Sequence, residues 1–246
     1  MSHLKLKLFQ ANSNMIDHKI NLIDPLLPKP AFRMVLLGPT QSGKSTLIRN
    51  ILFNENFGYC KYFDEIYLFI GSLDDIIETR KLIIKYKLSN KIKLEQQFNE
   101  EDVKELFDSI EIDSVKPNAP KVLFIFDDQI CNKICSNGKL GIIDQVMVRG
   151  RHANISCIIS TQKYMSLNNN IRALNISQLV IFSGTSNTDL EKVVEEHVGV
   201  YDAKSMLQTI KNDTEQRYSF VVIDNSKNGK ERLLNMDFQP IRSSDI

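Results

Sequence analysis

From residue 33 onward, short apolar runs alternate with longer segments in which apolar residues recur at helical spacing. This alternation is typical of strands joined by helices in a largely parallel sheet. The runs predict strands at residues 34–37, 65–70, 91–94, 122–126, 155–160, 179–182, 218–223 and 232–236. The amphipathic segments predict helices at residues 44–54, 73–86, 100–110, 140–149, 188–197 and 202–212.

The two ends of the chain depart from this pattern. Residues 1–30 include the proline-punctuated stretch NLIDPLLPKP, which predicts an extended N-terminal arm packed on its own domain or on a neighbour. Residues 31–246 are predicted to form one domain. In YSFVVIDNSKNGKERLLNMDF, apolar residues alternate on both sides of a polar turn at 225–229. The expected fold is therefore α/β, with a mostly parallel central sheet, helices on both faces and a C-terminal β-hairpin.

Composition narrows the function classes. The 246 residues are 42% hydrophobic and 25% charged, which is ordinary for a globular protein. The formal net charge of +1 gives the monomer no general attraction to nucleic acid, so any DNA contact has to be local or built by oligomerisation. No signal peptide is visible and no run approaches the roughly 20 apolar residues of a membrane span, so we expect an intracellular protein without direct membrane insertion.

The stretch MVLLGPTQSGKSTLIRN combines an apolar strand, the pattern G-x-x-x-x-G-K-S and an apolar-periodic helix. In that context the pattern predicts a P-loop, whose glycines let backbone amides wrap a phosphate at a helix N-terminus. Lys44 is predicted to reach the β- and γ-phosphates of ATP, and the Ser45 hydroxyl to ligate Mg²⁺. The predicted nucleotide contacts are Gly38, Pro39, Thr40, Gln41, Ser42, Gly43, Lys44, Ser45 and Thr46.

A second strand ends in two carboxylates, in KVLFIFDDQ. Its uninterrupted apolar run is typical of a central parallel strand, and ligands bind at the carboxyl ends of such strands. We expect Asp127 to hold Mg²⁺ and Asp128 to act as the base that activates water, which indicates ATP hydrolysis. A GTPase would need an N-K-x-D motif after a later strand, and a nucleoside monophosphate kinase an arginine-rich lid; the sequence has neither.

The segment VMVRGRHANISCIISTQ supplies three further candidates. Gln162 follows the strand at 155–160 and could hydrogen-bond both the γ-phosphate and the attacking water, as a sensor. Arg149 and Arg151 are the candidates for an arginine finger, which in ring ATPases comes from the neighbouring subunit. A basic surface turn after a helix is the alternative for this pair, and the spacing does not choose between the two arginines.

Together, LLGPTQSGKSTLIRNIL, VLFIFDDQ, RGRHANISCIISTQKYMSL and NIRALNISQLVIFSG resemble the FtsK-HerA superfamily. Within it they are most similar to the DNA-packaging ATPases of poxvirus-type large DNA viruses and virophages. The acid pair is often Asp-Glu in cellular members, whereas the Asp-Asp pair here resembles the viral branch. A segment at 170–175 matches a family stretch that carries an arginine, which makes Arg172 a weaker finger candidate.

The resemblance implies a RecA-like core that forms a homo-oligomeric ring, pentamer or hexamer, and moves double-stranded DNA into a preformed capsid. It implies ATP and Mg²⁺ as cofactors, a capsid vertex or virion membrane component as partner, and the host cytoplasm (viral factory) as location, with the virion as a second one. Residues 130–139 and 163–172 are the candidate DNA loops, with solvated connectors as the alternative for each. Two other functions stay open at this point: a nucleotide-gated capsid assembly protein and, less favoured, a P-loop nucleotide kinase.

Overall fold

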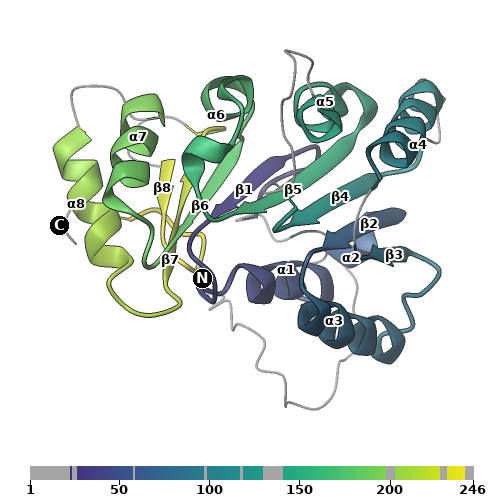
Figure 1. The fold of residues 1–246 in the computed structure, drawn as a ribbon, viewed down its shortest axis with the longest axis horizontal. Coiled ribbons are helices and arrows are strands. Elements are labelled where there is room, and N and C mark those ends of the chain that lie inside the picture. The colour runs from purple at the N-terminus through teal and green to yellow at the C-terminus, as the bar shows by residue number, and fades with distance from the viewer. Residues whose placement is uncertain are drawn as a thin grey trace, which may run out of the picture.

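The protein is described by a computed structural model, which covers residues 23, 27–57, 59–96, 99–116, 119–129, 141–197, 203–227 and 232–241. One eight-stranded sheet runs through it in the order β3-β2-β4-β5-β1-β6-β7-β8 (Figure 1). The pairs from β3 to β6 are parallel, while β7 is antiparallel to both β6 and β8. The predicted mostly parallel sheet and C-terminal hairpin are therefore confirmed.

Each predicted strand and helix has a counterpart. The strands are β1 (Arg33–Leu37), β2 (Glu65–Ile70), β3 (Ile92–Glu95), β4 (Val122–Asp127), β5 (Ile155–Thr161), β6 (Gln178–Phe182), β7 (Phe220–Asp224) and β8 (Leu233–Leu234). The matching helices are α1 (Lys44–Phe53), α3 (Leu73–Lys85), α4 (Glu100–Asp113), α5 (Ile142–Arg149), α7 (Asn187–His197) and α8 (Ala203–Asp213).

Four short elements were not predicted, because each is too short to show a helical period. They are the α-helices α2 (Tyr59–Tyr62) and α6 (Asn169–Leu174) and the 3₁₀ turns η1 (Gly150–Ala153) and η2 (Tyr164–Ser166). The last two strands are shorter than predicted: β7 starts two residues later, and β8 has only two residues. Tyr218 and Ser219, predicted as strand, instead belong to a turn.

Helices cover both faces of the sheet, as predicted. One apolar cluster packs α1, α2 and α3 on one face, and a second packs α4, α5, α7 and α8 on the other (Figure 1). The strands β4 and β5 between these layers are buried at every position, which explains their apolar runs without alternation. The strands β1, β4, β5 and β6 all end at the same side of the sheet, and the row of their C-terminal ends is called the carboxyl edge below. The row of their N-terminal ends is called the amino edge.

Helix starts follow local sequence signals. The Ser72 hydroxyl accepts a hydrogen bond from the Asp75 amide at 3.4 Å, and the Asn99 side chain accepts one from the Glu101 amide at 3.0 Å. Acidic residues fill the first turns of α3 and α4, where they complement the positive ends of the helix dipoles.

Most of the predicted N-terminal arm lies outside the described residues. Its described end packs on the domain: Leu27 is buried with α1 and α2, and the Tyr59 hydroxyl donates to the Pro28 carbonyl at 2.7 Å. Within the described part of the chain, no helix is both long and apolar enough to cross a membrane.

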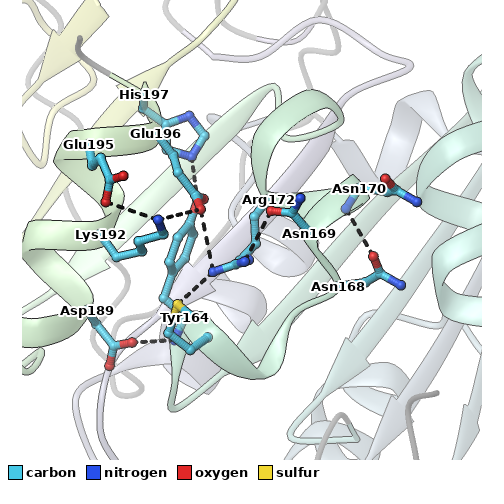
Figure 2. A network of polar contacts seen from close by, with 11 residues as sticks. Tyr164, Asn168, Asn169, Asn170, Arg172, Asp189, Lys192, Glu195, Glu196 and His197 are labelled. Carbon is cyan, nitrogen blue, oxygen red and sulfur yellow. Dashed lines mark hydrogen bonds and ion pairs between the residues drawn. The ribbon is translucent and has the colours of Figure 1, made fainter. Parts of the chain in front are cut away.

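A buried polar network joins η2 to α7 (Figure 2). The Tyr164 amide donates to Asp189 at 3.0 Å, and its hydroxyl donates to Glu196 at 2.7 Å and contacts Nε2 of His197 at 2.8 Å. Arg172 of α6 forms an ion pair with Glu196 at 3.5 Å, and both side chains are nearly buried. The segment that follows β5 is thereby tied to the helix that follows β6.

The hydrogen bonds of this network define the tautomer of His197. The amide oxygen of Asn225 accepts from Arg232, so its nitrogen faces Nδ1 of His197 at 3.1 Å. Because the Tyr164 proton is directed to Glu196, Nε2 carries the imidazole proton and Nδ1 accepts from Asn225. A proton at Nδ1 would meet another donor, and burial lowers the pKa of His197.

Folding stability should therefore depend on the protonation of His197. Since its pKa is lower in the folded chain than in the unfolded one, acid favours unfolding, and stability should be lost as pH falls below about 6.5. His197→Gln should flatten the slope of unfolding free energy against pH between 5 and 7, removing on the order of 1 kcal/mol of pH dependence in urea titrations. His152→Gln, at an exposed histidine on η1, is the control, and equal slopes in wild type and His197→Gln would contradict the prediction.

Candidate nucleotide site

The loop between β1 and α1 has the backbone of a phosphate cradle. Gln41 and Gly43 have positive φ angles, 62° and 107°, and no side chain caps the first turn of α1. A Cβ atom at Gly38 would lie 2.7 Å from Cβ of Phe182, so only glycine fits there. The amides at the start of α1 are thus left to a ligand, and the positive end of the helix dipole lies beside them.

Lys44 is buried at the start of α1. Its ammonium group donates to the carbonyls of Gly38 at 2.8 Å and Pro39 at 2.9 Å, so it lies along the loop that it is predicted to serve. Burial lowers the pKa of Lys44, while the charges of Asp128 and Asp127 raise it again. The structure therefore brings the predicted phosphate-binding lysine into the electrostatic field of both predicted carboxylates.

Asp127 and Asp128 lie at the carboxyl edge, at the tip of β4. Asp127 is 3% exposed, and its carboxylate accepts a hydrogen bond from Ser160. Burial raises the pKa of Asp127 although the hydroxyls of Ser160 and Ser45 lower it, and the neighbouring charge of Asp128 raises it further. Asp128 is half-buried and follows with a left-handed backbone, φ 53°, which turns it out of the strand direction.

The pair formed by Ser45 and Asp127 fits the predicted magnesium site. The Ser45 hydroxyl and the Asp127 carboxylate are hard oxygen donors near each other, the ligand type that Mg²⁺ prefers together with phosphate oxygens. Bound there, Mg²⁺ would neutralise charge on the phosphates.

Gln162 is exposed directly beyond β5, and β5 lies between β1 and β4 in the sheet. Because parallel strands end at one edge, the strand that carries Gln162 separates the P-loop strand from the acid pair. The predicted sensor position is thus beside both groups that it would have to contact. Thr161 anchors the turn after it, since its hydroxyl contacts the Lys163 carbonyl at 3.1 Å and the Ser166 hydroxyl at 3.0 Å.

Ser160 is a site residue that the sequence reasoning missed. Its fully buried hydroxyl donates to the Asp127 carboxylate and accepts from the Asp128 amide at 2.9 Å. One hydroxyl thus orients the side chain of the first acid and the backbone of the second. The sequence feature that could have indicated it is a serine inside an apolar strand that neighbours the strand of the acid pair.

Arg149 and Arg151 lie at the amino edge, because both precede β5. The seven residues of β5 separate them from the carboxyl edge by roughly 20 Å, so neither serves the nucleotide site of its own chain. Arg149 is bound to Glu111 and lies 5.4 Å from the Phe107 ring centre. Arg151 is exposed and lines a cavity of about 670 Å³ together with Arg33.

The remaining candidates are Arg172 and the two possible DNA loops. Arg172 is 7% exposed and bound to Glu196, and its guanidinium also contacts Met165 and Asn169, so it is part of the packing (Figure 2). Of the two candidate DNA loops, 130–139 lies outside the described residues. The other, 163–172, contains η2 and the first part of α6, and exposes Lys163 and Met165.

Comparison with known proteins gives one family and several similar structures. A family model described as Poxvirus A32 protein matches residues 23–239. No curated protein matches the chain.

The structure is similar to B204, the DNA-packaging ATPase from Sulfolobus Turreted Icosahedral Virus, with TM-score 0.58 and 19% identity over 80% of this chain and 94% of that one. For the genome packaging NTPase B204 of Sulfolobus turreted icosahedral virus 2 in complex with AMP, the TM-score is 0.57 at 18% identity, over 87% of this chain and 100% of that one. For the pCW3 conjugation coupling protein TcpA with ATPγS, the TM-score is 0.51 at 13% identity, over 78% of this chain and 57% of that one. These likenesses show the α/β fold of P-loop NTPases.

Removal of the Ser160 hydroxyl should impair the acid pair without emptying the site. Ser160→Ala leaves the buried Asp127 carboxylate without one donor and the Asp128 amide without its acceptor. We expect kcat for ATP hydrolysis to fall about 10- to 100-fold, with ADP affinity in the absence of Mg²⁺ unchanged.

Ser156→Ala is the matched control for this variant. Ser156 lies on the same strand, is equally buried, and its hydroxyl has no partner among the described residues. Its removal should leave kcat unchanged; equal kcat values for the two variants would contradict the assignment of Ser160.

Proposed function

Because this chain belongs to the Poxvirus A32 protein family, we propose that it is an ATP-driven motor that moves double-stranded viral DNA into a preformed capsid. The observation that carries the proposal is the junction of P-loop and acid pair. There Lys44 of α1 lies in the electrostatic field of Asp127 and Asp128 at the tip of β4, and the Ser45 hydroxyl lies near enough to Asp127 to lower its pKa. The similarity to B204, described as a DNA-packaging ATPase, supports the same function.

In the proposed hydrolysis, each group has one task. The loop from Gly38 to Gly43 and the first amides of α1 hold the phosphates, and Lys44 leaves the loop carbonyls to bind the β- and γ-phosphates. Asp128 takes the proton from the attacking water, which it can reach because its left-handed backbone turns it out of β4. Gln162 orients that water against the γ-phosphate.

The position of Arg149 and Arg151 at the amino edge supports a ring-shaped assembly. In a head-to-tail assembly, the amino edge of one subunit faces the carboxyl edge of the next, and such a heterologous interface gives a homo-oligomeric ring when the rotation between subunits closes. Arg151 is then the better finger, because among the described residues it has no ion pair, whereas Arg149 is bound to Glu111. A pair of guanidinium groups at 151 and 33 suits the charge that spreads over phosphoryl oxygens.

The remaining partners follow from this function. A ring needs only sequence-independent phosphate contacts repeated around its pore, and the exposed segment after Gln162 is the described candidate. We place the motor at the capsid vertex or a virion membrane component, in the viral factory of the host cytoplasm and with the virion.

DNA should stimulate ATP hydrolysis by the purified protein. Lys44→Ala and Asp128→Asn should each lower the DNA-stimulated rate about 100-fold or more, and Asp128→Asn should still bind ATP because the phosphate cradle is intact. Steady-state phosphate release with and without duplex DNA measures this. Hydrolysis that ignores DNA and survives Asp128→Asn would exclude the motor, and phosphate transfer to a small acceptor would indicate a kinase.

Mixed rings should reveal a finger that acts across the interface. Rings of Lys44→Ala subunits alone and of Arg151→Ala subunits alone should both be inactive. When the two are mixed at random, about a quarter of the sites should be active, because these have Lys44 from one subunit and Arg151 from the next. Mixing Lys44→Ala with Asp128→Asn is the control, because both defects lie in the same half of the site. If Arg149→Ala complements and Arg151→Ala does not, the choice of arginine is wrong.

A further inference from the structure

The order of the strands determines where the nucleoside of a bound nucleotide lies. The γ-phosphate has to reach Asp128 on β4 and Gln162 beyond β5, and both strands lie on one side of β1. The other side of β1 is occupied by β6 and then β7. Since the phosphate chain is held by the P-loop that follows β1, the ribose and base extend over the tips of β6 and β7.

Tyr218 lies at that place. It lies two residues before β7, whose first residue pairs with Phe182 at the end of β6, so the turn before β7 is at the carboxyl edge (Figure 1). A Cβ atom at Gly43 would lie 3.8 Å from Cδ1 of Tyr218, which puts the phenol ring next to the last loop residue before α1. In the described part of the chain, Tyr218 is the single aromatic residue with an exposed side chain, at 51% exposure.

The backbone holds this ring outward. Tyr218 has φ 69°, a left-handed conformation that is costly for an aromatic residue. The turn is tied down on both sides: the amide and hydroxyl of Ser219 donate to the Gln216 carbonyl at 3.1 and 2.5 Å, and Ser183 after β6 donates to the Ser219 carbonyl at 2.9 Å. Strained positions that persist under such restraint are concentrated at ligand sites.

We propose that Tyr218 is the stacking platform for the nucleobase of the nucleotide bound in the P-loop. The inference rests on the proposed nucleotide site and adds the part that holds the base. The Arg217 guanidinium lies 4.7 Å from the centre of the Tyr218 ring, which is within the range of a cation–π contact. This contact would add to the stacking interaction between the ring and the base. The ligand class is a nucleoside di- or triphosphate.

Stacking makes a prediction about selectivity as well. Every base presents a π face, so a platform of this kind binds without reading the hydrogen-bonding edge of the base. ADP and GDP should therefore bind with affinities within about fivefold of each other, whereas inorganic tripolyphosphate, which has no base, should gain nothing from Tyr218.

The test uses the absence of tryptophan from the sequence. Tyr218→Trp introduces a single tryptophan at the proposed platform, and ADP should quench its emission while tripolyphosphate should not. Tyr86→Trp is the matched reporter, because Tyr86 is a half-buried aromatic that stacks on Phe53 away from the carboxyl edge, and ADP should leave its emission unchanged.

Affinity provides the second measurement. Tyr218→Gly removes the ring at a residue whose positive φ glycine adopts freely, so it does not add backbone strain. By calorimetry, this variant should bind ADP about tenfold more weakly than wild type and tripolyphosphate equally well, and Tyr218→Phe should bind ADP as wild type does.

Each other outcome overturns a defined part of the scheme. Wild-type ADP affinity in Tyr218→Gly would overturn the platform, and if that variant also lost stimulation by DNA, the ring would belong to the DNA contact instead. Equal weakening of ADP and tripolyphosphate would show that Tyr218 supports the loop and not the base. If Lys44→Ala does not weaken either ligand, the proposed nucleotide site itself fails.

Discussion

The site depends on one buried carboxylate. Asp127 of β4 accepts a hydrogen bond from Ser160 of β5, and the hydroxyl of Ser45, the last residue of the P-loop pattern, is near enough to lower its pKa. A charged carboxylate in an apolar environment is costly unless it is hydrogen-bonded, and its raised pKa reflects that cost. One side chain therefore lies between the start of α1 and the strand that precedes Gln162.

Strand direction then divides the chemistry between two edges. The loops after β1, β5 and β6, the tip of β4 and the turn before β7 meet at the carboxyl edge, where the P-loop, the acid pair and the Tyr218 ring lie. The segment before β5 puts the arginines at the amino edge, beside Arg33 of β1. Burial and the nearby charge of Arg151 lower the pKa of Arg33, so a positive surface is concentrated there. The proposed nucleotide site and the arginine proposed to complete it in the next subunit therefore lie at opposite edges of one chain.

Most of the sheet and the P-loop were predictable, since buried parallel strands read as apolar runs and the phosphate pattern requires a strand before it and a helix after it. Ser160 was not predictable, because a serine in a strand gives no sign of which neighbour its hydroxyl meets. Tyr218 was read as the first residue of β7, and only the turn reveals that its ring is exposed. The edge occupied by Arg151 could have been predicted, because residues that precede a parallel strand always lie opposite the ligand edge.

The network around Tyr164 shows how a change at the γ-phosphate could travel. Gln162 is separated from Tyr164 by one residue, and Tyr164 is bound through its amide to Asp189 and through its hydroxyl to Glu196. Buried hydrogen-bond networks stiffen the elements that they join, although Nε of Arg172 has no hydrogen-bond partner among the described residues. A displacement of Gln162 would therefore move η2 together with α7. Arg172 belongs to the same network, which couples α6 to this motion. The exposed Lys163 lies between sensor and network, so a backbone shift started by hydrolysis would pass through the segment that is the candidate for DNA contact.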